Sequence, residues 1–194
     1  MPTALIVLAP GAEEIETIVA ADVLVRGGVQ VTLASVGPEP VAGAPSTVVG
    51  SRGIILGAHA RFDAVATQNF DLVYLPGGNG SATTCTEDPR IQALAERQLR
   101  SGRWLAALCA APRALVPRKL CAGRNVTSFP GVRAEVEPHA KAWLDQPVVV
   151  DGNLITSQAA GTTMHLALKL VELLSNRATA DQVASNIHLP PTAR

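Results

Sequence analysis

Residues 104–112 read WLAALCAAP, which predicts a short buried strand, Trp104 to Leu108, ending in a sharp turn at Cys109. A helix is expected directly after the turn. A nucleophile on such a strand-to-helix turn requires small residues two positions before and after it, and Ala107 and Ala111 meet that requirement. The segment therefore predicts a nucleophile-elbow cysteine. At a helix N-terminus the dipole and the free N–H groups would favour the thiolate. The alternative is a buried structural cysteine, since Cys is among the most buried residue types.

Apolar runs of strand length alternate with stretches of helical period on both sides of this turn. The expected strands are residues 3–9, 29–36, 71–75, 104–108, 125–129, 147–150 and 154–157, with one or two short strands within 46–62. The expected helices are residues 13–26, 88–100, 110–116, 162–174 and 180–187, and residues 38–45 and 76–80 are expected loops. This alternation is typical of an α/β fold, a mainly parallel sheet with helices on both faces. The length of 194 residues fits a single domain, 1–194.

The composition excludes several classes of protein. Hydrophobic residues make up 47% of the chain and charged residues 16%, which excludes an intrinsically disordered protein. The 16 Lys and Arg residues balance the 16 Asp and Glu residues. The chain therefore has no excess of positive charge to attract nucleic acid or an anionic membrane. Only 3% of its residues are aromatic, so few side chains could stack on bases.

The three cysteines, Cys85, Cys109 and Cys121, form no Cys-x-x-Cys pair. A disulfide framework and a metal site are therefore not expected, and a reducing compartment is favoured. The apolar run from Thr3 to Ala9 is too short to span a membrane and lacks the basic start of a signal peptide. We expect a cytoplasmic protein that associates with no membrane.

Two further turns lie at the carboxyl ends of predicted strands, where ligands bind in sheets of this kind. Glu13, Glu14 and Glu16 occupy the first helical turn after strand 3–9. Acids are common there because their negative charge interacts favourably with the positive end of the helix dipole and stabilises the helix. Ile15, Ile18, Val19 and Val23 recur at helical spacing, and this spacing places Glu16 beside Val19 and Val23 at the edge of the apolar face, with Glu13 and Glu14 further towards solvent. A partly buried Glu16 would have a raised pKa and could donate and accept a proton near neutral pH.

The second turn is Pro76-Gly77-Gly78, directly after strand 71–75. Two glycines can expose backbone N–H groups to a ligand oxygen, as an oxyanion hole requires. A Pro-Gly turn is also a common connection without any such role.

Together, the motifs GAEEIE (residues 11–16), LPGG (75–78) and LCAAP (108–112) resemble those of the ThiJ/PfpI superfamily. Within it, the match is to the branch of the Parkinsonism-associated protein deglycase and bacterial YajL-like proteins. The resemblance runs nearly end to end and implies a flavodoxin-like sandwich that forms a homodimer.

By position, the resemblance implies that Cys109 is the nucleophile and Glu16 its protonated partner. Gly78 and Ala110 would supply backbone N–H groups beside the sulfur, with Gly77 in support. Arg26 and Arg52 match a basic pair near the dimer interface of family members; the alternative is two ordinary surface arginines.

Two departures from the family pattern concern the pocket. Phe129 stands where the animal deglycase carries a His close to the reactive cysteine, so a Cys-His dyad is not expected. Ala159-Ala160 replaces the more usual Gly-Pro. Protease and glutaminase activity are not expected either, because Ala110 follows Cys109 and no His-x-Glu pair is present.

Two functional hypotheses follow from the resemblance. The first is a cofactor-free, cysteine-dependent enzyme that converts small dicarbonyls, such as methylglyoxal and glyoxal, or their early glycation adducts on proteins, to 2-hydroxy acids, in protection against carbonyl and oxidative stress. The second is a redox-responsive chaperone or sensor in which Cys109 is oxidised and turnover is incidental.

Overall fold

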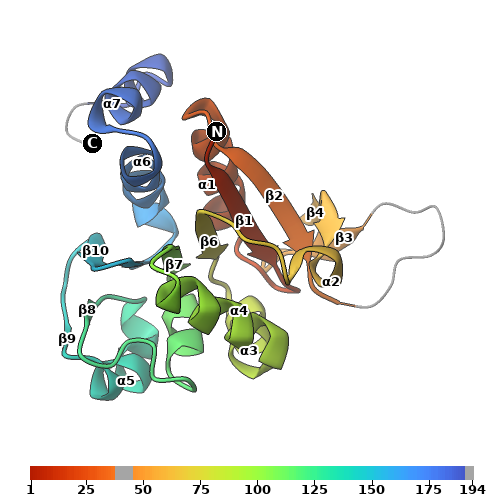
Figure 1. Cartoon of the computed structure of the whole chain (residues 1–194), viewed down its shortest axis with the longest axis vertical. Coiled ribbons are helices and arrows are strands. Elements are labelled where there is room, and N and C mark those ends of the chain that lie inside the picture. Colours follow the sequence, from red (N-terminus) through yellow and green to blue (C-terminus); the bar gives the residue numbers. More distant parts are fainter. Residues whose placement is uncertain (38–45, 191–194) are drawn as a thin grey trace.

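The computed structural model describes residues 1–37 and 46–190. Its main sheet has seven strands in the order β10-β11-β7-β6-β1-β2-β5 (Figure 1). The strands are β1 (Thr3–Leu8), β2 (Gln30–Ser35), β5 (Ala60–Arg61), β6 (Leu72–Leu75), β7 (Trp104–Leu108), β10 (Val148–Asp151) and β11 (Leu154–Ser157). All neighbours pair in parallel except β10, which runs antiparallel to β11. The expected loop at 38–45 lies outside the described residues.

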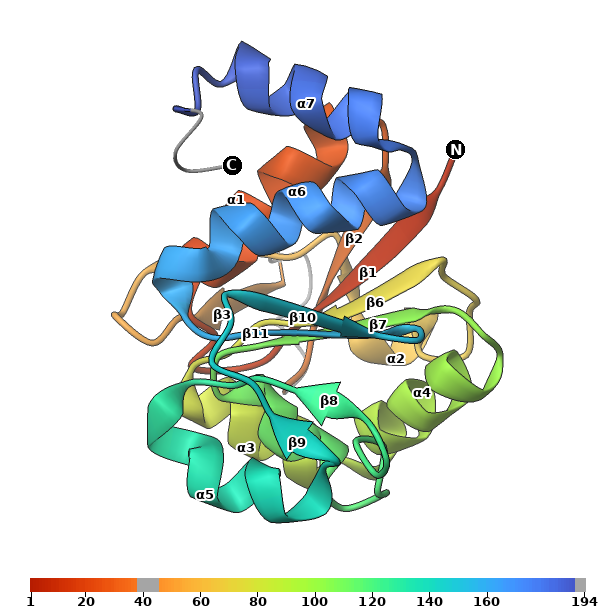
Figure 2. The same cartoon turned by 90° about the vertical axis from the view of Figure 1, so that its left-hand side faces the viewer.

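Helices cover both faces of this sheet (Figure 2). One face carries α1 (Glu14–Arg26), α6 (Thr163–Leu174) and α7 (Arg177–Asn186); the other carries α2 (Phe62–Val65), α3 (Asn79–Glu87), α4 (Pro89–Arg100) and α5 (Arg133–Val136). Two buried apolar clusters fill the space between the sheet and these layers. The central strands β1, β6 and β7 are almost continuously apolar because both of their faces are buried. The predicted fold class is thus confirmed.

Helix α4 begins where the sequence predicts, since the Asp88 side chain accepts a hydrogen bond from Arg90 N–H at 2.9 Å and Pro89 is the first helical residue. Helix α3 was not predicted. Its sequence, NGSATTCTE, is mostly polar and has little helical pattern, so its position depends on packing against the sheet. Cys85 therefore lies in a helix.

Two expected elements around Cys109 are shorter than predicted. The helix after it is a five-residue 3₁₀ helix, Ala111–Leu115. The strand expected at 125–129 is reduced to β8 (Asn125–Val126), which pairs with β9 (Ala142–Trp143) in a separate small sheet. The following residues bond elsewhere: Thr127 N–H donates to Thr156 Oγ1, and Phe129 N–H donates to the Cys109 carbonyl.

Helix α1 buries only part of the apolar face that helical spacing predicts: Val23 is buried and Val19 packs partly buried against the core. Ile15 and Ile18 are 53% and 47% exposed, whereas Glu14 and Glu16 are buried. The short strands expected within 46–62 are present as an antiparallel hairpin, β3 (Thr47–Val49) and β4 (Ile55–Gly57), beside the start of α1. Apolar side chains of α1 are thus left on the surface next to this hairpin.

A search of the described helices finds none that combines the length and the hydropathy needed to cross a membrane.

The contact between α1 and α6 generates a test of this packing. A methyl group at Gly27, which ends α1, would lie 2.6 Å from a Val171 methyl group of α6. We expect Gly27→Ala to lower the free energy of unfolding by about 1–3 kcal/mol, the usual cost of overpacking. Urea denaturation measures it, with Gly57→Ala as control, since a methyl group there meets no atom within 4 Å. Equal stability of the two variants would contradict the packing described here.

Candidate active site

Cys109 occupies the turn between β7 and the 3₁₀ helix in a left-handed backbone conformation, with φ of 62°. A non-glycine residue in this region costs of order 1–3 kcal/mol and persists only where the surroundings enforce it. Here Cys109 N–H donates to the Ser157 carbonyl at 2.9 Å, and the Cys109 carbonyl accepts from Phe129 N–H at 2.8 Å. Ala107 and Ala111 are both fully buried against the turn. The sheet and the segment before Phe129 therefore hold the side chain at a fixed place.

Glu16 is fully buried beside this cysteine. Its Oε2 accepts a hydrogen bond from Gly77 N–H at 2.7 Å, and its backbone carbonyl accepts one from the Tyr74 hydroxyl at 3.0 Å. Glu13 caps the helix by accepting the Glu16 N–H at 2.9 Å. The bonds from β6 and the cap at Glu13 together fix Glu16 at the carboxyl end of the sheet. The positioning role of Tyr74 gives no signal in the sequence.

Neither Gly77 nor Gly78 has room for a side chain. A Cβ at Gly77 would lie 2.6 Å from Glu16 Oε2 and 2.7 Å from Cys109 Cβ. Gly78 has φ of 85°, and a Cβ there would overlap the Gly11 carbonyl oxygen. Glycine alone allows the backbone to pass this close to the cysteine.

The backbone N–H groups of Ala110 and Gly78 interact with the Cys109 sulfur and act to lower the pKa of its thiol. These are the two groups that the family resemblance implies. Their placement suits stabilisation of a charge on the sulfur or on an oxygen bonded to a carbon next to it.

The pKa of Glu16 is raised to about 7: burial raises it most, hydrogen bonds from Cys109 and Gly77 lower it, and the charge of Glu13 raises it. Glu16 Oε1 is buried without a hydrogen-bond partner within residues 1–37 and 46–190, so no neighbouring donor there stabilises a charge on this oxygen. Near neutral pH the side chain can therefore both donate and accept a proton.

The expected lowering of the Cys109 pKa by a helix dipole is wrong. Burial raises the pKa of the thiol, an ionised Glu16 raises it further, and only the N–H groups of Ala110 and Gly78 act in the opposite direction. The 3₁₀ helix has five residues, too short for an appreciable dipole. When Glu16 holds a proton its repulsion disappears, so the thiolate forms more readily beside a neutral Glu16 than beside a charged one.

Cys109 opens into a cavity of about 250 Å³. The lining residues are Glu13, Glu16, Ser51, Arg52, Gly78, Asn79, Cys109, Ala110, Phe129, Ala159 and Ala160. Both departures from the family pattern thus lie on the cavity wall: Phe129, which is 44% exposed, and the Ala159-Ala160 pair. Asn79 was not singled out in the sequence, where it reads as part of a turn.

Of the predicted site residues, the structure brings together Cys109, Glu16, Gly77, Gly78, Ala110 and Arg52. It does not bring Arg26 to them. Arg26 ends α1, about 15 Å along the helix from Glu16, and pairs on the surface with Asp22 at 2.6 Å.

Glu14 was expected near solvent and is instead buried, with 6% of its surface exposed. Its carboxylate accepts hydrogen bonds from Ser51 Oγ–H at 2.9 Å and from Arg52 N–H at 2.6 Å. No pattern in the sequence indicated this, because both donors lie more than 35 residues away.

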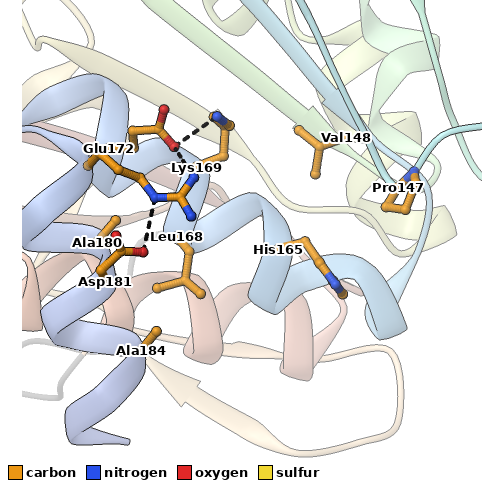
Figure 3. A pocket seen from close by; sticks show the side chains of 10 residues that line it. Pro147, Val148, His165, Leu168, Lys169, Glu172, Ala180, Asp181 and Ala184 are labelled. Atoms are coloured by element: carbon orange, nitrogen blue, oxygen red, sulfur yellow. Dashed lines mark hydrogen bonds and ion pairs between the residues drawn. The ribbon is translucent and has the colours of Figure 1, made fainter. Parts of the chain in front are cut away.

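A larger cavity, of about 320 Å³, lies between α6, α7 and β10 (Figure 3). Its charged side chains pair with one another: Glu172 with Lys169 at 2.8 Å, and Arg177 with Asp181 at 3.0 Å. None of its described lining residues is a cysteine, so this cavity lacks the nucleophile that the Cys109 cavity contains. The described residues also hold no group of three or more His, Cys, Asp or Glu side chains that could bind a metal ion.

The chain matches known proteins over most of its length. Residues 2–173 match the model of the DJ-1/PfpI family. Protein dj-1beta of Drosophila melanogaster is 38% identical over 186 residues, covering 95% of this chain and 96% of that protein. Its crystal structure has a TM-score of 0.88 at 35% identity and covers 97% of this chain and 98% of its own.

A relative from Caenorhabditis elegans, named glutathione-independent glyoxalase DJR-1.2, is 38% identical over 173 residues, covering 89% of this chain and 88% of that protein. The family therefore includes a protein named as an enzyme. These matches confirm the resemblance read from the three motifs. The chain belongs to the DJ-1/PfpI family.

Proposed function

We propose that this protein is a cofactor-free cysteine enzyme that converts reactive dicarbonyls, or their early glycation adducts on proteins, to 2-hydroxy acids. The observation that carries the proposal is the contact between Cys109 and the buried Glu16, with the N–H groups of Gly78 and Ala110 at the same sulfur. The name of the C. elegans relative supports the same reaction class.

The reaction uses these groups in order. The Cys109 sulfur adds to the aldehyde carbon, and the resulting hemithioacetal oxygen lies near the N–H groups of Gly78 and Ala110. Glu16 removes the proton from that carbon and returns a proton to the neighbouring one, so the enediol becomes a thioester. Water then hydrolyses the thioester and frees the thiol. In total, one dicarbonyl and one water give one 2-hydroxy acid, and the reaction needs no external oxidant or reductant.

Turnover of methylglyoxal tests this proposal. Removing a proton shuttle typically costs 10²- to 10⁴-fold in rate, so we expect Glu16→Ala to lower kcat/KM by about that factor, towards the level of Cys109→Ala. Glu87→Ala, at the exposed end of α3, is the control and should keep its activity. Circular dichroism verifies folding. Most of the activity remaining in Cys109→Ala would show that another group carries the reaction.

A specific observation also favours the second candidate, a redox sensor or redox-responsive chaperone. Cys85 and Cys121 have no exposed surface, whereas Cys109 is partly exposed. Burial raises the pKa of both Cys85 and Cys109 to about 12, so access and not thiolate character separates the two thiols. Oxidation requires access to the sulfur, so Cys109 is the expected target.

We expect dilute hydrogen peroxide to convert Cys109 to the sulfinic acid before it modifies Cys85 or Cys121. A proton on Glu16 can donate a hydrogen bond to the sulfinate oxygen, and such charge-assisted bonds are about twice as strong as neutral ones. Peptide mass spectrometry over a peroxide series measures the order and the product. Earlier modification of Cys85 would argue against the sensor.

We also propose a homodimer, formed through the exposed apolar side chains of α1 and the adjoining β3–β4 hairpin. Ile15, Ile18, Ile54 and Ile55 are each about half exposed or more, and a patch of this kind marks an interaction surface.

Light scattering at micromolar concentration should therefore give twice the chain mass of 20.1 kDa. Charges on this face should separate the protomers, so Ile15→Glu combined with Ile18→Glu is expected to be monomeric. Val150→Glu, at an exposed position of the edge strand β10, is the matched control. A monomeric wild type would remove this proposal.

A further inference from the structure

Glu14 ties the turn at residues 51–54 to the start of α1. Its carboxylate accepts three hydrogen bonds from that turn: Ser51 Oγ–H at 2.9 Å, Arg52 N–H at 2.6 Å and a longer one from Ile54 N–H at 3.4 Å. Burial opposes the charge, but these bonds outweigh it, and the pKa of Glu14 lies below its ordinary value. A Cβ at Gly50 would lie 2.6 Å from the Glu14 carboxyl carbon, so the backbone of the turn is packed directly onto this side chain.

The turn carries Arg52 to the rim of the Cys109 cavity. Among the described residues that line the cavity, Arg52 is the only cation. Its guanidinium has no ion-pair partner within residues 1–37 and 46–190, unlike Arg26, which pairs with Asp22. The same cavity also holds the carboxyl groups of Glu13 and Glu16. Without Arg52, the charge of Glu13, and that of Glu16 whenever it is ionised, would repel an anion from the cysteine.

We propose that Arg52 is a specificity-determining residue that binds a carboxylate on the carbonyl substrate, and that Glu14 is the residue that positions it. The carbonyl chemistry in this statement rests on the proposed function, whereas the anion site does not. Guanidinium matches a carboxylate in a bidentate geometry, and a charge held on a fixed turn loses less conformational freedom when a ligand binds.

Alkylation of Cys109 tests the anion site without any turnover. Iodoacetate and iodoacetamide are nearly isosteric, and in both the sulfur displaces iodide from carbon, but only iodoacetate is an anion. We expect Arg52→Gln to lower the ratio of the two rates at Cys109, iodoacetate over iodoacetamide, by about tenfold, the lower end of electrostatic focusing in a cleft. The iodoacetamide rate should not change.

Arg100→Gln is the matched control, because it removes the same charge from a side chain that is 80% exposed on α4, outside the cavity lining. It should leave the ratio as in wild type. Salt at 1 M should shrink the difference between wild type and Arg52→Gln, since it screens charges beyond about 3 Å. An Arg52→Gln ratio equal to that of wild type would overturn the proposal.

Glu14→Gln separates positioning from general stability. If Glu14 acts through Arg52, this variant lowers the ratio as well, and the double variant loses no more than Arg52→Gln alone. A Glu14→Gln variant that merely destabilises the fold would instead accelerate both reagents and expose the buried Cys85 to alkylation, which peptide mass spectrometry detects. That pattern, or full additivity of the two changes, would overturn the role of Glu14.

A substrate comparison then links the site to the reaction. Methylglyoxal is neutral, and 4,5-dioxopentanoate carries the same aldehyde and ketone with a carboxylate two carbons away. We expect wild type to favour 4,5-dioxopentanoate over methylglyoxal in kcat/KM by about tenfold and Arg52→Gln to lose that preference. Failure of both substrates would reject the proposed function, and the alkylation ratio decides the anion site in either case. Equal preference in wild type and Arg52→Gln would reject the carboxylate specificity.

Discussion

The hydrogen bond from Gly77 N–H to the buried Glu16 carboxyl joins the first helix to the carboxyl end of the central strands. Burying a carboxyl group is costly, and the surrounding structure compensates through the Gly77 N–H and the contact with Cys109. Burial also gives Glu16 a pKa of about 7, so the compensation that makes the helix fit the sheet places a proton-transfer group beside the cysteine. The Glu16 side chain thus both joins the helix to the sheet and supplies the proton-transfer group.

The backbone around Glu16 has little freedom as a result. Gly77 and Gly78 have no room for a side chain, and Cys109 is held in a left-handed conformation by β11 and by Phe129 N–H. Such strain is retained where the surroundings over-determine the conformation, and it is typical of functional sites. The cavity is therefore rigid at its floor, while its rim comes from a turn that depends on Glu14.

Much of the fold could be predicted because its patterns are local. The apolar runs of β1, β6 and β7 reflect burial on both faces, and Asp88-Pro89 marks the start of α4 through backbone capping. Helix α3 could not be predicted because its residues are mostly polar. The shortness of β8 could not be predicted because hydrogen bonds to distant residues interrupt the strand. Part of the predicted apolar face of α1, Ile15 and Ile18, is exposed for a similar reason, since the neighbouring sheet and hairpin decide which side of the helix is buried.

The sequence by itself determined the α/β class, the order of the elements and the three turns that converge at the carboxyl ends of the strands, because alternation, capping and glycine spacing act over a few residues. It also singled out Cys109, Glu16, Gly78 and Ala110, through a family resemblance. Only the tertiary structure decided that Arg26 lies apart, that Glu14 is a buried anchor and that the cysteine has no helix dipole to lower its pKa. Burial and charge at a site depend on residues far apart in the chain, and no local pattern records them.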